Sequence, residues 1–145
     1  MRKAYVLDAC ALIAFLSGEN GSEKIKLILQ DAFEEKVNLK MNHINLLEVY
    51  YNTIKKYDQN TANKVLEEIG ELPIEIIIGL KIDVLKEAGR IKTKYKIPLG
   101  DSIAVAECIV RNGILVTSDH NDFEKLQKEE KISINWFRWK CKTST

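Results

Sequence analysis

The residues of this sequence best suited to do chemistry are four acidic side chains: Asp8, Glu48, Asp101 and Asp119. Asp8 is the clearest case, because it interrupts the nearly apolar segment KAYVLDACALIAFL, where an unpaired buried carboxylate would cost several kcal/mol. Four carboxylates that met in space would repel one another and be driven toward protonation unless a cation lay among them. Oxygen ligands without a His or Cys cluster favour Mg²⁺ or Mn²⁺ over zinc. Such an ion suits hydrolysis of phosphodiester bonds, because it lowers the pKa of bound water and neutralises charge on phosphoryl oxygens.

The elements that would position these acids follow from the periodicity of apolar residues. Strand-like alternation or β-branched content predicts strands over Ala4–Leu7, Val37–Met41, Pro73–Ile78, Ile114–Thr117 and Ile132–Trp136. Helical spacing and end signals predict helices over Ala11–Leu16, 21–36, Asn42–Lys56, Asn60–Ile69, 80–94, Asp101–Val110 and 122–128. Strands that alternate with helices predict an α/β protein whose parallel sheet of about five strands is covered on both faces. At 145 residues, the chain has the size of a single domain, 1–145.

A parallel sheet would gather the acids at one edge. Sites in such sheets form outside the carboxyl ends of the strands, near the point where strand order reverses. Asp8 follows the first strand and Asp119 follows the fourth, so both belong to this edge. Asp101 begins the helix that leads into the fourth strand, which places it at the same edge. Glu48 lies on the border of an apolar helical stripe and is expected to face the protein more than water.

Each acid also has a purely structural interpretation. Asp101 could be a helix cap that interacts with the helix dipole, and Asp119 or Asp122 could cap the helix that begins near Phe123. Glu48 could be an ordinary exposed helix residue. The prediction of a metal site therefore depends on the joint pattern of the acids and not on any one of them.

The basic residues point less clearly to a partner. A net charge of +1 does not indicate binding to nucleic acid, so any such contact has to come from local clusters. Three lysines are candidate contacts to a nucleic-acid backbone: Lys92, Lys94 and Lys96. A solvated helix face explains most of them better. The tail WFRWKCK, 136–142, mixes aromatic and basic residues as single-strand binders do, although Trp136 and Phe137 could simply complete the core.

Cysteine usage and hydropathy bear on location and assembly. Three cysteines without a CxxC pair predict reduced thiols in a cytoplasmic protein, with Cys10 and Cys108 as small buried hydrophobes. No segment has the roughly 20 apolar residues of a membrane span, so no membrane partner is expected. Helices across 42–69 carry Tyr50 and Tyr51, and also Tyr57, which is more aromatic surface than a monomer normally exposes and predicts a two-fold homodimer.

Four segments resemble the signature segments of PIN-domain nucleases, particularly the VapC-like toxins of type II toxin–antitoxin modules. They are VLDACALIAFL with Asp8, INLLEVYY with Glu48, PLGDSIAVAECI with Asp101 and ILVTSDHNDF with Asp119. The resemblance implies a three-layer α/β/α fold, Mg²⁺- or Mn²⁺-dependent endoribonuclease activity on an RNA substrate, homodimerisation and an antitoxin protein partner. It carries over these four acids as catalytic residues and metal ligands. Thr117 carries over as a supporting hydroxyl and Asp122 as an occasional extra acid.

Two residues depart from the family pattern. Ala9 stands where Thr or Ser commonly follows the first acid, and Ser102 stands where a small apolar residue often follows the third. Loss of the first hydroxyl removes a hydrogen bond that could support the ligands, which we expect to weaken metal affinity without abolishing the site.

Two other functions compete with a nuclease. A catalytically idle PIN-like module that binds RNA or a protein is disfavoured, because an idle site does not need four mutually repelling charges. A phosphoryl-transfer enzyme or receiver of the doubly wound type is disfavoured by the absence of a Gly-rich phosphate loop and of a DxD arrangement at Asp8.

Overall fold

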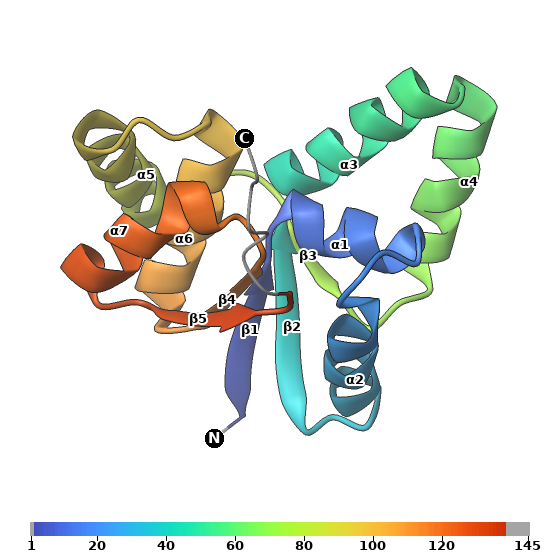
Figure 1. Cartoon of the computed structure of the whole chain (residues 1–145), viewed down its shortest axis with the longest axis horizontal. Helices are drawn as coiled ribbons and strands as arrows, with labels where there is room; N and C mark the ends of the chain where they lie inside the picture. The colour runs from blue at the N-terminus through green and yellow to red at the C-terminus, as the bar shows by residue number, and fades with distance from the viewer. Residues whose placement is uncertain (1, 139–145) are drawn as a thin grey trace, which may run out of the picture.

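A computed structural model describes residues 2–138 and joins five strands in one parallel sheet (Figure 1). The strands are β1 (Lys3–Leu7), β2 (Val37–Asn42), β3 (Glu75–Ile77), β4 (Ile114–Thr117) and β5 (Ser133–Trp136). The helices are α1 (Ala9–Leu16), α2 (Ser22–Phe33), α3 (His43–Lys56), α4 (Gln59–Gly70), α5 (Ile82–Lys94), α6 (Leu99–Arg111) and α7 (His120–Glu130). This architecture confirms the predicted α/β fold class.

Strand order reverses in the middle of the sheet. The order is β3-β2-β1-β4-β5, so the chain moves outward from β1 to β3, and α5 and α6 then return it to β4. β1 and β4 are direct neighbours, with Leu7 opposite Val116 near their carboxyl ends. The residues that follow these two strands therefore lie side by side, at the place where open parallel sheets form their sites.

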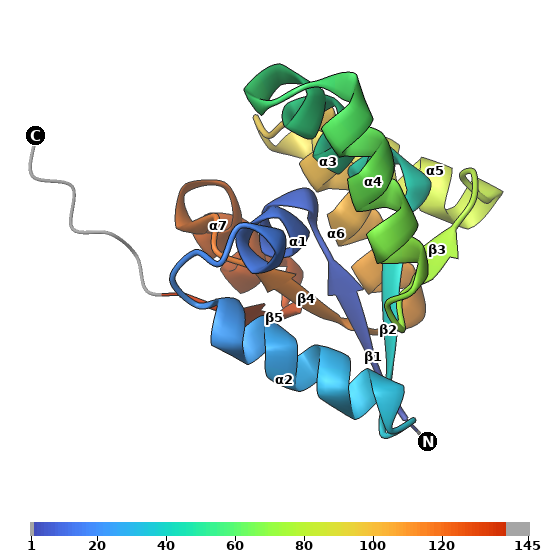
Figure 2. The same cartoon turned by 90° about the vertical axis from the view of Figure 1, so that its right-hand side faces the viewer.

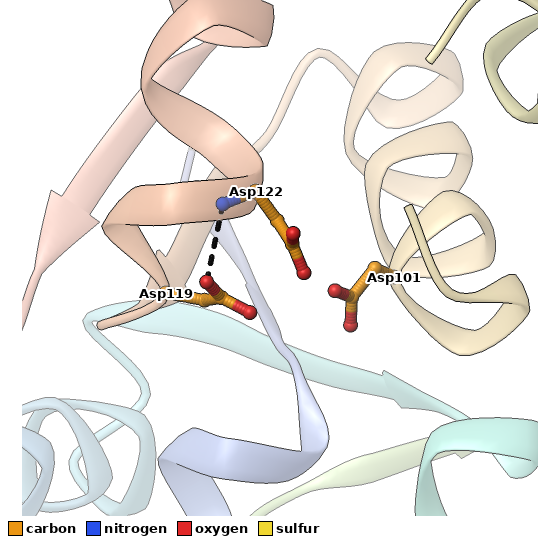
Figure 3. Close-up of side chains that lie close together, drawn as sticks. All are labelled: Asp101, Asp119 and Asp122. Atoms are coloured by element: carbon orange, nitrogen blue, oxygen red, sulfur yellow. Dashed lines mark hydrogen bonds between the residues drawn. The ribbon is translucent and has the colours of Figure 1, made fainter. Parts of the chain in front are cut away.

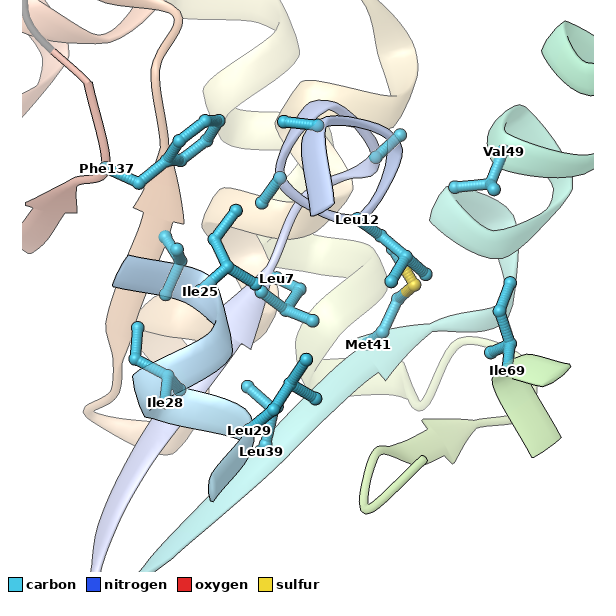
Figure 4. Close-up of a cluster of buried hydrophobic side chains, with 14 residues drawn as sticks. Leu7, Leu12, Ile25, Ile28, Leu29, Leu39, Met41, Val49, Ile69 and Phe137 are labelled. Atoms are coloured by element: carbon cyan, nitrogen blue, oxygen red, sulfur yellow. The ribbon is translucent and has the colours of Figure 1, made fainter. Parts of the chain in front are cut away.

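Apolar side chains fill both faces of the sheet. Successive residues of a strand point to opposite faces, and Val6 and Leu7 are both completely buried on either side of β1. Leu7 packs with α1 and α2 in the larger cluster, whose members include Leu12 and Ile25 (Figure 4). Val6 packs with residues of α5, α6 and α7, among them Phe123. The layers are thus helix, sheet and helix.

The pair α3 and α4 extends beyond the carboxyl edge of the sheet (Figures 1 and 2). Val49 anchors this pair in the larger core cluster, and the Tyr50 hydroxyl donates to Asn63 Oδ1 at 2.7 Å. Tyr51 and Tyr57 are 43% and 60% exposed, whereas Tyr50 is partly buried.

Four helices begin earlier than the sequence predicts: α4 begins one residue earlier, and α1, α6 and α7 begin two residues earlier. α6 begins at Leu99 because Pro98, with φ of −57°, suits a helix start and its carbonyl accepts from the Ser102 N–H at 3.1 Å. α1 begins at Ala9 because Asp8 caps it. Phe137 is buried and completes the core, while residues 139–142 of the predicted tail, with Cys141, lie outside the described residues. Within residues 2–138, no helix has both the length and the apolar character needed to cross a membrane.

Candidate metal centre

Three aspartates form the centre of the acidic site. Asp101, Asp119 and Asp122 each offer a carboxylate oxygen, and these oxygens lie within 4.8 Å of one another. Figure 3 shows Asp101 on the first turn of α6 facing Asp119 and Asp122 at the start of α7. Asp119 accepts from the Asp122 N–H at 3.2 Å. It is therefore the N-cap of α7, as its structural interpretation predicts, and also a member of the acidic cluster. Asp101 does not cap its helix, whose N-cap is Pro98.

Asp8 follows β1, next to this centre, and is only 2% exposed. Its Oδ1 accepts from the Ala11 N–H at 2.9 Å, and the Cys10 thiol donates to both carboxylate oxygens at 3.0 and 3.2 Å. Burial raises the pKa of Asp8, although hydrogen bonds from Thr117, Cys10 and Ala11 act against that rise. The buried Asp8 carboxylate is therefore hydrogen-bonded and not unpaired, and its charge also acts on Asp101.

Glu48 reaches the same site from α3. A Cβ at Gly100 would lie 1.5 Å from Glu48 Oε1, so the carboxylate rests directly against the backbone of the residue before Asp101. No side chain larger than hydrogen fits there without moving Glu48. Burial and the charge of Asp8 raise the pKa of Glu48, and a hydrogen bond from Asn45 opposes that rise. Glu48 therefore borders Asp101 and interacts with the charge of Asp8, but it is not among the acids close enough to share an ion.

The acids strongly disfavour full ionisation of one another. Burial, a hydrogen bond shared with Asp122 and the charge of Asp8 raise the pKa of Asp101 to about 9. Burial and the Asp122 carboxyl raise the pKa of Asp119 to about 6, although the Asp122 backbone N–H acts in the opposite direction. Folding has brought these groups together at an energetic cost that a cation would remove.

The donor set fits Mg²⁺ or Mn²⁺. Its converging atoms are all carboxylate oxygens, the ligands that hard divalent ions prefer. His120 follows Asp119 but is engaged elsewhere: its Nδ1 lies 3.1 Å from Glu124 Oε1 and its ring stacks on Trp136. Among residues 2–138, the aspartate triad is the one group of His, Cys, Asp or Glu side chains close enough to share an ion.

Thr117 lies directly before the acidic turn that contains Asp119. It is completely buried at the end of β4, and its Oγ1 accepts from the Asp119 N–H at 3.1 Å. The bond fixes the backbone where the chain turns from β4 toward α7. Arg138 lies nearby: its Nε donates to Ser118 Oγ at 3.0 Å, and its charge opposes the rise that burial causes in the pKa of Asp8.

Two of the three candidate lysines have partners within the chain. Lys92 donates to the Ile97 carbonyl at 2.8 Å, and Lys94 forms an ion pair with Glu130 at 3.0 Å. Lys96 is exposed. The ammonium groups of Lys92 and Lys94 therefore make contacts within the chain that stabilise the structure.

Sequence reasoning missed three residues of the site. Cys10 is not simply a small buried hydrophobe, because its thiol contacts Asp8, and that carboxylate together with burial raises the thiol pKa. Its place two residues after Asp8 was the available signal. Gly100 directly precedes Asp101 in the segment PLGDSIAVAECI, but its type alone does not indicate contact with Glu48, and Asn45 has no visible signal in the sequence. Cys108 is buried as predicted, with its thiol donating to the Gly113 carbonyl at 2.9 Å.

Comparison with known families places this geometry in context. The sequence model of the PIN domain matches residues 5–129. The chain belongs to the PIN domain family. The family match confirms the resemblance seen in the four acidic segments and covers all four of their acids. A comparison with curated protein sequences finds no match.

Solved structures share the fold of this PIN domain protein. DNA-bound VapBC from Salmonella typhimurium has a TM-score of 0.71 at 16% identity, over 95% of this chain and 100% of that one. VapBC-1 from nontypeable Haemophilus influenzae has a TM-score of 0.69 at 14% identity, over 92% and 98%. A toxin–antitoxin complex from Klebsiella pneumoniae has a TM-score of 0.64 at 18% identity, over 92% and 98%. At these identities the likeness is one of fold.

Proposed function

We propose that this chain is a metal-dependent endoribonuclease that hydrolyses phosphodiester bonds of RNA. The observation that carries the proposal is the convergence of acids at the β1–β4 switch point, where mutual repulsion calls for a cation. The proposed catalytic residues and metal ligands are Asp8, Glu48, Asp101 and Asp119, with Asp122 beside them. Membership of the PIN domain family supports this assignment, and the match over residues 5–129 supports a single domain over 1–145.

The residues of the site would divide the work. The three aspartates of the centre converge closely enough to hold Mg²⁺ or Mn²⁺. Asp8 and Glu48 add negative charge next to them. The bound ion supplies an activated water and neutralises charge on the phosphoryl oxygens. The acids alone would repel a phosphate, so RNA should bind the site weakly without the ion.

We further propose that the chain is the toxin of a toxin–antitoxin pair and acts in the cytoplasm. Solved structures that share its fold over 92–95% of the chain include VapBC and toxin–antitoxin complexes. An apolar pocket of about 310 Å³ on the α3–α4 pair offers a surface for an antitoxin segment; its lining residues are His43, Ile44, Leu46, Leu47, Tyr50 and Leu66. The exposed rings of Tyr51 and Tyr57 support a homodimer. The free thiols of Cys10 and Cys108 are consistent with a reducing compartment.

The test incubates purified, partner-free protein with structured and single-stranded RNAs in Mg²⁺, in Mn²⁺ and in EDTA. Scission should require the ion and should disappear in Asp101→Asn, which excludes a contaminating ribonuclease. Tight RNA binding that is equal in EDTA, without scission in any metal, would instead identify an idle binding module. A single-stranded DNA of the same sequence in parallel tests whether RNA is the preferred substrate.

A further inference from the structure

Asn45 is a completely buried polar residue beside the acidic site, one turn before Glu48 on α3. Its Nδ2 donates to the Gly100 carbonyl at 3.0 Å and to Glu48 Oε1 at 3.5 Å. These partners determine the orientation of the amide, because the flipped form would place its oxygen against two acceptors. Asn45 therefore joins α3 to the first turn of α6, next to Asp101.

Gly100 provides the space in which this arrangement fits. A Cβ there would lie 1.5 Å from Glu48 Oε1 and 2.6 Å from its Cδ. The Glu48 carboxylate thus packs on the backbone of the residue before Asp101. The hydrogen bond from Asn45 to the Gly100 carbonyl joins α3 to α6 at this point, and the same Nδ2 contacts the Glu48 carboxylate, so the amide links the position of Glu48 to the backbone that precedes Asp101.

Stability alone does not account for Asn45. Its Oδ1 is buried without a hydrogen-bond partner among residues 2–138. An amide whose oxygen is buried and unpaired is less favourable for folding than an apolar side chain of similar volume. Local arrangements that disfavour folding persist mainly where they serve a site.

We propose that Asn45 is the positioning residue for Glu48 in the acidic site. The inference rests on the proposed function, because Glu48 needs a defined position only if it helps to hold the ion. Asn45 acts through Glu48 and through the spacing of α3 and α6. Residues that orient metal ligands in this way commonly change metal affinity by about 10- to 100-fold when they are replaced.

The test measures Mn²⁺ affinity by calorimetry, and the thermal unfolding midpoint in EDTA, for the full chain. Asn45→Leu should keep or raise the midpoint and weaken Mn²⁺ binding by about 10-fold or more. Gly100→Ala should weaken binding similarly although Asn45 is intact, because the new Cβ displaces Glu48. Asn45→Leu combined with Glu48→Gln should bind no more weakly than Glu48→Gln alone. Thr53→Val, which removes a 2.7 Å bond to the Val49 carbonyl within α3, is the matched control and should bind Mn²⁺ normally.

Wild-type affinity in folded Asn45→Leu would overturn the inference, as would additive losses in the double variant. If Asn45→Leu does not fold, Asn45→Ser decides the question, because it removes the same contacts with a smaller side chain. Wild-type protein that binds no Mn²⁺ would overturn the acidic site itself. Glu48→Gln that binds Mn²⁺ normally would overturn the ligand role of Glu48, and with it the inference about Asn45, but not the aspartate site. The failure of the inference and the failure of the proposed function are therefore distinguishable.

Discussion

Glu130 and Asp101 are carboxylates on neighbouring helices of the same layer, but their surroundings are opposite. Glu130, at the end of α7, accepts from Arg90 at 2.7 Å, Lys94 at 3.0 Å and the Tyr95 hydroxyl at 2.9 Å. These donors lower its pKa to about 2. Asp101 meets other acids instead, and burial together with those acids raises its pKa to about 9.

The difference shows how one side-chain type serves two purposes. Where the chain supplies the cations, as around Glu130, the carboxylate ties α5 to α7. Where the chain supplies only more carboxylates, as around Asp101, the repulsion is relieved either by protonation or by a cation from outside the chain. Substitutions in the two clusters should therefore have opposite effects on stability and activity.

The largest expected difference is in catalysis. Asp119→Asn should lower the rate of RNA cleavage in Mn²⁺ by about 100-fold or more, because it removes a proposed ligand. Asn is also a good N-cap, so α7 should stay intact. Glu130→Gln should keep the wild-type rate. Rates come from single-turnover cleavage of one labelled RNA, and equal activity of the two variants would remove the distinction between the clusters.

Metal should stabilise the protein through the Asp101 cluster alone. At an Mn²⁺ concentration of about 100 times Kd, the free energy of unfolding should rise by about 2.7 kcal/mol, and EDTA should reverse the gain. Glu130→Gln should show the same gain and Asp101→Asn little of it. Urea unfolding with and without Mn²⁺ measures these values. A full gain in Asp101→Asn would mean that the ion binds elsewhere.

Without metal, the order of stabilities should reverse. Glu130→Gln should lower the free energy of unfolding by about 1–2 kcal/mol, because it weakens charged hydrogen bonds to Arg90 and Lys94 that are partly exposed to solvent. Asp101→Asn should raise it by about 1 kcal/mol, because it relieves repulsion. Urea unfolding in EDTA measures both changes, and a destabilised Asp101→Asn would contradict the assigned repulsion.

The smallest effects should appear in the pH dependence of stability in EDTA. The pKa of Glu130 is lower in the folded protein than its unfolded value of about 4.3, so its contribution is present above about pH 4.3 and is lost as pH falls toward 2. The pKa values of Asp101 and Asp119 are raised, so the folded state binds more protons, and stability falls as pH rises from about 4 toward 9.

Variants separate these two limbs of the pH profile. Glu130→Gln should flatten the acid limb, and Asp101→Asn should flatten the neutral-to-alkaline limb. Thermal unfolding midpoints from pH 3 to pH 9 test both, with acid-limb data read only where unfolding is reversible. Unchanged slopes in both variants would show that neither carboxylate has the assigned environment.

Local patterns were enough to predict the sheet and the edge where the acids lie. Strand alternation and helical spacing depend on residues a few positions apart, and every predicted strand and helix has its counterpart within residues 2–138. Asp8 and Asp119 were placed correctly for the same reason, because the carboxyl ends of neighbouring parallel strands meet at one edge whatever the side chains do.

Contacts between distant side chains were decided by the tertiary structure. Asp122, expected as an occasional extra acid, joins Asp101 and Asp119 in the close triad, while Glu48 reaches the site by packing on Gly100. Lys94, a candidate for nucleic acid, pairs with Glu130 from a helix 36 residues away in sequence. Such contacts depend on the angles at which helices cross and on the side-chain rotamers that fit between them. Local sequence patterns give neither the crossing angles nor the rotamers.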